Sequence, residues 1–169
     1  MHDSNPYAAP SAPLQLHDVE VMADRLTRLG ASLIDSAIIW VVMVPLMWFG
    51  GYLPAVIESA QRGEQLHIGL ILLWIPIGTA VFAAVHWWPL KTGGQTWGKR
   101  IVGIQIVTLD GQQVAPLRVI LARHLPVRAV SGIPFVGAFL MMINICMIFR
   151  QDRRCGHDFV AGTRVVRAR

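Results

Sequence analysis

The sequence predicts an all-α integral membrane protein, a polytopic helical bundle of about four membrane segments with a small cytosolic β element. Composition is the first observation behind this prediction: 54% of the 169 residues are hydrophobic and 15% are charged, whereas soluble domains carry about 25% charged residues. The second is the presence of two apolar stretches of membrane-spanning length. The third is that the basic residues behind the net charge of +5 lie beside the apolar stretches, where the positive-inside rule places them. A nucleic-acid partner is therefore not expected.

Two membrane spans follow an N-terminal tail. Residues 1–22 are expected to form a disordered cytosolic tail, because they are rich in Pro, Ala and polar residues and lack the pattern of a secretory signal. The membrane domain is residues 23–169. Its first span is predicted at about 29–51, where Asp35 is the only charged residue, and its second at about 66–90, which contains no Asp, Glu, Lys or Arg. Each exceeds the roughly 20 residues that a helix needs to cross the hydrocarbon core.

Two short segments predict the β element. In residues 101–114, β-branched residues alternate with others around the turn signal Asp110-Gly111, which is typical of a strand and a tight turn. Residues 160–166 contain a second run of this type. Because one strand alone is unstable, we expect the two to pair on the same side of the membrane.

This pairing constrains the chain between the two strands, which must then cross the membrane an even number of times. Residues 133–149 are apolar enough for a span, whereas residues 117–131 carry three arginines and a histidine. We expect this second segment to be a short, amphipathic or re-entrant partner of the last helix. Basic blocks on both sides of the region support the same topology through the positive-inside rule, with both termini cytoplasmic.

The carboxylate of Asp35 is the most informative feature of the first span, because an unpaired charge at that depth costs roughly 2.5–3.5 kcal/mol. Arg28 precedes it by two helical turns, about 10.5 Å along the axis. We expect Arg28 to extend to the lipid headgroups and Asp35 to find a partner on another helix. Comparable depths on the other segments predict that Asp35 shares one cytosol-facing polar cluster with His86, Arg123, His124 and Asn144.

Two interpretations of this cluster remain open. A carboxylate beside His or Arg in a low dielectric has a tunable pKa, which suits a proton or ion relay. Alternatively, Arg123 neutralises Asp35 and Asn144 bridges two helices, so that the cluster fixes helix packing without transporting anything.

Basic residues in two loops are expected to contact lipid headgroups. Gly93–Lys99 matches a phosphate-binding G-x4-G-K loop, but Arg100 stands where the magnesium-binding Ser or Thr belongs. We therefore expect Lys99 and Arg100 to meet anionic headgroups, as should Arg153 and Arg154 in the C-terminal region.

The pair His157-Asp158 resembles part of a metal site, but the sequence offers no further ligands at a suitable spacing. We expect Asp158 to form a salt bridge with a nearby arginine or to cap the following turn. No metal and no cofactor are predicted. An enzyme is not expected either, because no nucleophile–base pair emerges.

Three blocks of the chain resemble the RDD family of bacterial membrane proteins. They are RLGASLID at residues 28–35, GQTWGKRIVGIQIVTLDG at 94–111 and CGHDFVAGTRVV at 155–166. The family is named for one arginine and two aspartates. Arg28 and Asp35 match the first two, and Asp158 matches the second aspartate, with Asp152 as the alternative. The resemblance implies a multi-pass protein of the bacterial inner membrane, in a family suspected of moving ligands and partly associated with cation/proton antiport.

Two functions of different classes follow. The first is a transporter or transport-associated protein, with cation/proton exchange in which Asp35 titrates, Arg28 sets its electrostatics and Asp158 locks the cytosolic tail. The alternative is a non-transporting membrane scaffold or assembly factor in which the Arg/Asp set is structural. The expected partners are the lipid bilayer, a monovalent cation or proton, and further copies of the chain, because four short spans make a thin bundle.

Overall fold

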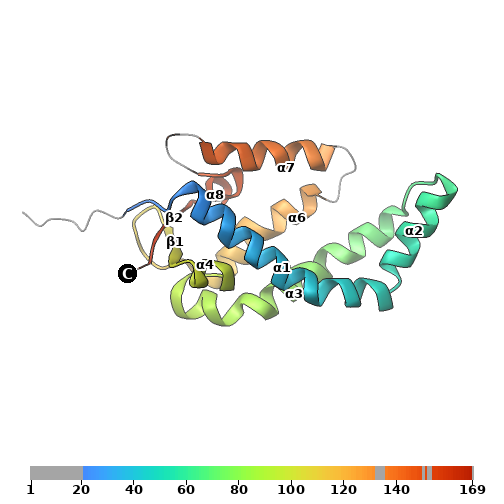
Figure 1. Ribbon diagram of the computed structural model, residues 1–169, viewed down its shortest axis with the longest axis horizontal. Helices are drawn as coiled ribbons and strands as arrows, with labels where there is room; N and C mark the ends of the chain where they lie inside the picture. Colours follow the sequence, from blue (N-terminus) through green and yellow to red (C-terminus); the bar gives the residue numbers. More distant parts are fainter. Residues whose placement is uncertain (1–20, 132–135, 150, 152–153, 169) are drawn as a thin grey trace, which may run out of the picture.

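Two long helices and a small sheet organise the protein (Figure 1). The computed structural model describes residues 21–131, 136–149, 151 and 154–168, so nearly all of the predicted tail lies outside the described residues. In chain order the elements are α1 (Arg25–Phe49), α2 (Tyr52–Arg62), α3 (Ile68–Gly93), α4 (Trp97–Ile101), β1 (Ile104–Thr108), α5 (Pro116–Arg118), the π-helical turn η1 (Val119–His124), α6 (Leu125–Ser131), α7 (Val136–Cys146), the 3-10 turn η2 (Met147–Phe149), α8 (Gly156–Ala161) and β2 (Thr163–Arg167). The sheet, α4 and α8 lie at one end of the long helices, and α2 lies at the other.

The helices α1 and α3 correspond to the two predicted spans. The α1 helix begins after Asp24, whose side chain accepts a hydrogen bond from the backbone N–H of Leu26 at 3.0 Å. The α3 helix begins after His67, whose Nδ1 accepts from the N–H of Gly69 at 3.2 Å, and ends at Gly94 in the left-handed region. At 25 and 26 residues, each is about 38 Å long, more than the roughly 30 Å of a bilayer core.

Both long helices present apolar surface outward. In the most apolar 18-residue stretch of each helix, only 17% of the residues in α1 and 11% of those in α3 are buried within the chain. A core helix of a soluble protein would be mostly buried, whereas large exposed side chains such as Leu33, Val41, Leu72 and Leu73 cover these two. Apolar surface of this extent is stable against lipid and unstable against water. The described residues therefore contain two helices fit to cross a membrane.

The two remaining predicted spans have a different form. Residues 117–131 are divided among α5, η1 and α6, and residues 133–149 contain α7 and η2. At 11 residues, α7 is about 16 Å long, roughly half a bilayer core. The fold is mostly helical with a small sheet, as predicted, but in the part of the chain that the structure describes only α1 and α3 have spanning length. The bundle of four membrane segments remains a prediction.

The two predicted strands are both present and pair with each other. Strands β1 and β2 are antiparallel, with Ile106 opposite Val165. The predicted turn follows β1, and Gly111 adopts a φ of 78°, which favours glycine. The N–H of Ala23 also donates to the carbonyl of Val165 at 3.1 Å. The start of α1 is therefore fixed to the sheet, close to the C-terminal strand.

The second strand begins later than expected. The prediction placed it at 160–166, but residues up to Ala161 belong to α8, and β2 runs from Thr163 to Arg167. The reason is a capping box: Asp158 accepts from the backbone N–H of Cys155 and stabilises the first turn of α8. Gly162, at a φ of 59°, then ends the helix and lets the strand start.

The buried core lies at the sheet end of the molecule. It joins the two strands to the first turns of α1, the end of α3 and the start of η1. Its members are Ala23, Ala31, Leu90, Ile104, Ile106, Val114, Val119, Ile120 and Val165. This core holds together the loops that carry the family-like sequence blocks.

Candidate functional site

Asp158 is the centre of a buried ion cluster at the sheet end. Its carboxylate is fully buried and receives two arginines: Arg28 Nη2 lies 2.6 Å from Oδ2, and Arg123 Nη2 lies 2.9 Å from Oδ1. The arginines come from α1 and η1, and Asp158 comes from α8. One carboxylate therefore connects three elements that are far apart in the sequence. Removing one partner of a buried pair typically costs 3–5 kcal/mol, because the other charge stays buried and unpaired.

The charge of Asp158 is fixed at neutral pH. Burial alone would raise its pKa, but the neighbouring positive charges of Arg123 and Arg28 outweigh burial and hold the pKa well below its usual range. This geometry corrects two predictions. Arg28 is 5% exposed and does not extend to the headgroups. Arg123 pairs with Asp158 and does not neutralise Asp35.

His157 and Asn144 complete the Asp158 cluster. Arg123 Nη2 lies 3.1 Å from His157 Nε2, and His157 Nδ1 lies 3.2 Å from the side-chain oxygen of Asn144. A guanidinium only donates, so Nε2 accepts and Nδ1 carries the proton. Burial and then the charge of Arg123 lower the pKa of His157 to about 3, so the ring is neutral. Asn144 was predicted to accompany Asp35, but it binds α8 through His157.

Asp35 has a separate set of partners at the start of α4. Its Oδ1 accepts from the backbone N–H of Gly98 at 2.7 Å, and its Oδ2 accepts from the hydroxyl of Thr96. Thr96 is the N-cap residue of α4 but makes no cap bond of its own. Asp35 thus caps α4 from another helix, where a carboxylate is favoured by the helix dipole.

Only glycine fits at position 98. A Cβ on Gly98 would lie 2.2 Å from the carbonyl oxygen of Ala31 and 2.9 Å from Cγ of Asp35. The absence of a side chain allows α4 to lie directly on α1, which brings its N–H within reach of the carboxylate. The predicted need for a partner outside the first span is met here by backbone and hydroxyl donors.

Lys99 and His86 flank the Asp35 carboxylate. Lys99 Nζ lies 3.5 Å from Oδ2 and donates to the Thr96 hydroxyl at 3.3 Å. It is 9% exposed, so its predicted contact with headgroups is wrong. Burial, followed by the charge of Arg123, lowers the pKa of Lys99 to about 8, although Asp35 opposes the shift. His86 is fully buried with Nε2 4.0 Å from Oδ1, and its Nδ1 faces the Trp97 N–H at 3.4 Å.

The predicted single cluster is therefore two clusters. Asp35 and His86 lie together, whereas Arg123 and Asn144 belong to Asp158. His124 stacks on Phe82 with ring centroids 3.7 Å apart. The division follows from α8, which folds back on η1 and offers Arg123 a nearer carboxylate. Similar depth along separate helices cannot reveal which face each helix turns to its neighbours.

The basic residues predicted to contact headgroups differ in their exposure. Arg100 is exposed and lies over the Trp88 ring at 4.5 Å, which leaves that prediction open. Arg154 is half-buried, donates to the carbonyl of Thr163 at 3.2 Å and lies over the Phe159 ring at 4.1 Å. It therefore braces α8 and β2 within the chain. Arg153 lies outside the described residues.

A possible metal-ligand set does occur around Asp158, with a third member that the sequence did not suggest. The ligand atoms of Cys155, His157 and Asp158 lie within 4.8 Å of one another. However, Arg123 already occupies His157 Nε2 and one oxygen of Asp158, and Arg28 occupies the other. Burial raises the pKa of Cys155, so its thiol stays protonated. Two guanidinium groups in this position do not suit a bound cation.

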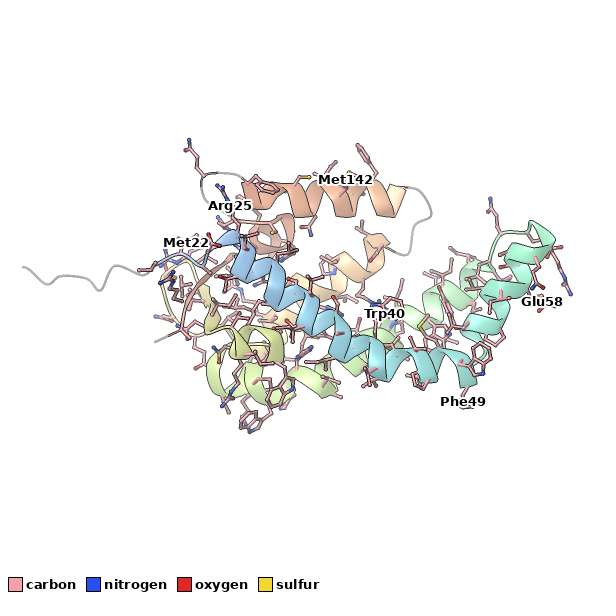
Figure 2. All side chains as sticks on the ribbon, in the orientation of Figure 1. Met22, Arg25, Trp40, Phe49, Glu58 and Met142 are labelled. Atoms are coloured by element: carbon pink, nitrogen blue, oxygen red, sulfur yellow. The ribbon has the colours of Figure 1, made fainter. Side chains whose placement is uncertain are left out.

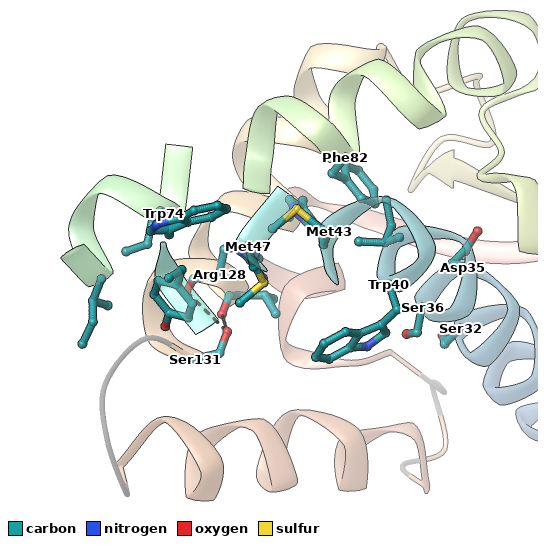
Figure 3. A pocket seen from close by; sticks show the side chains of 16 residues that line it. Ser32, Asp35, Ser36, Trp40, Met43, Met47, Trp74, Phe82, Arg128 and Ser131 are labelled. Atoms are coloured by element: carbon teal, nitrogen blue, oxygen red, sulfur yellow. Dashed lines mark hydrogen bonds between the residues drawn. The ribbon is translucent and has the colours of Figure 1, made fainter. Parts of the chain in front are cut away.

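A cavity of about 500 Å³ adjoins the Asp35 cluster (Figure 3). It lies between α1, α3 and the segment of η1 and α6. Asp35 with Ser32 and Ser36 lies at one end, and Trp74 lies toward the other. Methionines and aromatic side chains make up much of the wall, and His124 and Arg128 contribute charge or hydrogen-bonding groups. Such a cavity, apolar with a few polar groups, is typical of small-molecule sites.

Comparison with known proteins identifies the family. A model of the RDD family matches residues 22–162. The chain belongs to the RDD family. It is also 34% identical over 141 residues to the uncharacterized protein YckC of Bacillus subtilis (strain 168), a match that covers 83% of this chain and 82% of YckC. No solved structure matches the chain. RDD proteins are membrane proteins, in agreement with the outward apolar surfaces of α1 and α3.

The arginine and the two aspartates that match the family name do not form a single cluster. Arg28 contacts Asp158 directly, whereas Asp35 sits in the other cluster. The alternative second aspartate, Asp152, lies outside the described residues. Three further members were not predicted, Thr96, Gly98 and Cys155, and His157 was considered only as part of a metal site. The sequence signals were the repeated small and polar residues of GQTWGKR and the spacing of three between Cys155 and Asp158, which is that of a capping box.

Proposed function

We propose that this RDD protein is a proton-coupled membrane transporter, with Asp35 and Lys99 as the group that exchanges a proton for a monovalent cation. The observation that carries this proposal is that Asp35 belongs both to the cavity wall and to an ion pair with Lys99. Its carboxylate lines the 500 Å³ cavity and at the same time lies 3.5 Å from the buried ammonium of Lys99.

The exchange would balance charge at one carboxylate. With its pKa lowered to about 8, Lys99 can release a proton near neutral pH. A monovalent cation that enters beside Asp35 would then replace the ammonium as counter-charge, and its departure would allow Lys99 to take up a proton again. One cation and one proton move in opposite senses, and the buried carboxylate is never left without a positive partner.

Proteoliposomes test this directly. The full chain is reconstituted with a pH-sensitive dye inside, and a gradient of Na⁺, K⁺ or Li⁺ is imposed. We expect the wild type to change the internal pH, Asp35→Asn to be inactive although inserted, and Lys99→Met to lose the proton movement. The control is Glu58→Gln on the exposed face of α2, far from Asp35. A silent wild type, or Asp35→Asn with normal exchange, would refute transport through this pair.

A second function has its own supporting observation. The Asp158 cluster is buried and its carboxylate does not titrate near neutral pH, so it has the character of a lock between α1, η1 and α8. We propose as the alternative a non-transporting scaffold or assembly factor, in which both ion clusters hold the cytosolic end for a partner. This alternative expects no flux from the wild type and a loss of stability or oligomer yield in Asp35→Asn.

For either function we propose four membrane segments, with both termini in the cytoplasm of a bacterial inner membrane. The pairing of β1 with β2 supports an even number of crossings between them. Met22 and Arg25 lie at the sheet end and Glu58 lies at the other (Figure 2), which supports a return of the chain through α3. Lys91, Arg100, Arg118 and Arg167 add positive charge at the sheet end, as the positive-inside rule expects. Oligomerisation is proposed as well, because the described bundle is thin.

A further inference from the structure

Arg128 is a charged residue to which the helices described by the structure offer no counter-ion. It lines the cavity and lies against α3 at Gly78, because a Cβ at Gly78 would be only 2.1 Å from Arg128 Nη2. Gly78 is the eleventh of the 26 residues of α3, so the guanidinium lies near the middle of a membrane-spanning helix. An unpaired arginine at that depth costs roughly 2.5–3.5 kcal/mol or more.

No protein group of the described residues offsets that cost. None of the ion pairs formed by the described residues includes Arg128. Its Nε has no hydrogen-bond partner there either, and the same holds for Trp74 Nε1 and His124 Nε2, two other residues of the cavity wall. The cavity's own carboxylate, Asp35, already has Lys99 as its counter-charge. Counting the described residues, the cavity therefore has one positive charge in excess.

Arg128 and Asp35 lie at different positions along the cavity, as the residues of α3 beside them show. Trp74, Gly78, Phe82 and His86 follow one another at intervals of four, so they share one face of the helix. Along the axis of α3, His86 lies beside Asp35, and Gly78 lies beside Arg128. The two levels are about 12 Å apart at 1.5 Å per residue. Met43, Met47 and Trp40 from α1 supply apolar wall between and around the two levels (Figure 3).

We propose that the cavity binds an anionic amphiphile, with a phosphate or carboxylate on Arg128 and an apolar chain along the methionine and aromatic wall. A guanidinium binds either anion in bidentate geometry, which is strong in a low dielectric. The volume of about 500 Å³ lies within the range of roughly 300–1,000 Å³ of small-molecule pockets. The site stands whether or not the chain transports a solute, because it supplies the missing counter-charge of Arg128.

The test is equilibrium binding to the purified full chain in a non-ionic detergent, by scintillation proximity with labelled probes. Dodecyl phosphate represents a lipid phosphate, laurate represents a fatty acid, dodecanol has a chain of the same length without charge, and inorganic phosphate has the charge without a chain. We expect saturation at one molecule per chain for one or both anionic amphiphiles, at least tenfold tighter than for dodecanol. The preference between phosphate and carboxylate identifies the source. Equal affinity for dodecanol or for inorganic phosphate overturns the proposal.

Two variants assign the site to Arg128. Arg128→Gln should remove the preference for the anionic probes, a loss of at least tenfold, and leave dodecanol unchanged. Gly78→Ala should weaken them as well, because its methyl group displaces the guanidinium. That variant should fold, because the atom displaced is the end of a flexible side chain. Arg62→Gln, on the exposed surface of α2, is the matched control and should bind as the wild type does. Unchanged selectivity in both Arg128→Gln and Gly78→Ala refutes the site.

Because binding is measured without a gradient, its outcome is independent of the flux assay. Flux without amphiphile binding would retain the Asp35–Lys99 exchange and reject the anion site. Binding without flux would do the reverse.

Discussion

Two ion pairs of this protein have the same length and opposite surroundings, and comparing them tests the role assigned to Asp158. Arg28–Asp158 and Arg62–Glu58 both measure 2.6 Å. The side chains of the first pair are 6% and 0% exposed, and those of the second are 61% and 60% exposed. An exposed pair contributes roughly 0–1 kcal/mol, because water screens both charges. Breaking a buried pair costs about 3–5 kcal/mol.

The variants are Asp158→Asn, Arg28→Met and the control Glu58→Gln. Asp158→Asn should lower the free energy of unfolding by about 4 kcal/mol or more, because two guanidinium groups are left buried without a carboxylate. Arg28→Met should cost less, about 3 kcal/mol, because Arg123 still neutralises Asp158. Glu58→Gln should stay within about 0.5 kcal/mol.

The measurement is equilibrium unfolding in mixed micelles of increasing SDS content, followed by tryptophan fluorescence. The double variant Arg28→Met/Asp158→Asn adds a second condition. Since both changes act on one contact, it should be less destabilised than the sum of the single variants. Asp158 does not hold α1, η1 and α8 together if Asp158→Asn and Glu58→Gln have equal effects on stability. The same conclusion follows if the stability losses of Arg28→Met and Asp158→Asn are additive.

Gly98→Ala should lower stability by about 2 kcal/mol or more, because its Cβ would meet the Ala31 carbonyl at 2.2 Å and separate α4 from Asp35. The same unfolding measurement on Gly30→Ala, where nothing lies within 4 Å, should show no loss and a gain of up to about 1 kcal/mol; equal losses would contradict the close approach. Stability should also fall on acidification below pH 6.5. The unfolded chain then binds a proton that folded His157, with its pKa lowered to about 3, does not accept. Between pH 6.5 and 5 the loss is about 1.6 kcal/mol, because the unfolded histidine is half protonated at pH 6.5 and the slope approaches 1.36 kcal/mol per unit only below it. His157→Asn should lose this contribution and show a smaller dependence of the unfolding free energy on pH than the wild type, since other buried histidines remain; a dependence equal to that of the wild type would rule out His157 as a source.

Local patterns were enough to predict much of the fold. Apolar length gave α1 and α3, and the alternation around Asp110-Gly111 together with the β-branched run near the C-terminus gave the two strands that pair. Each of these follows from neighbours within a few residues of one another. The start of α8 did not follow in this way, because its cap depends on the fit of Asp158 into a buried cluster.

The partners of the candidate site could not be obtained from the sequence. Arg28 and Asp158 are 130 positions apart, and nothing local indicates that α8 returns to the start of α1. A lysine and an arginine beside an apolar stretch have the same appearance, yet Lys99 turns inward and Arg100 turns outward. The orientation of α4 decides this difference. It is set by the contact of Gly98 with α1, which is tertiary.

The two aspartates of the RDD pattern differ in how much positive charge surrounds them, and this difference separates their roles. Asp158 has two permanently charged guanidinium groups, so its proton is absent at any physiological pH and it can only hold elements together. Asp35 has one lysine, whose proton can leave, and donors from Thr96 and Gly98 that carry no full charge. The clusters are coupled nevertheless, since the charge of Arg123 helps to lower the pKa of Lys99. In the proposed exchange, the Asp35–Lys99 pair would supply the proton beside the cavity, and the Asp158 cluster would hold the surrounding elements in place.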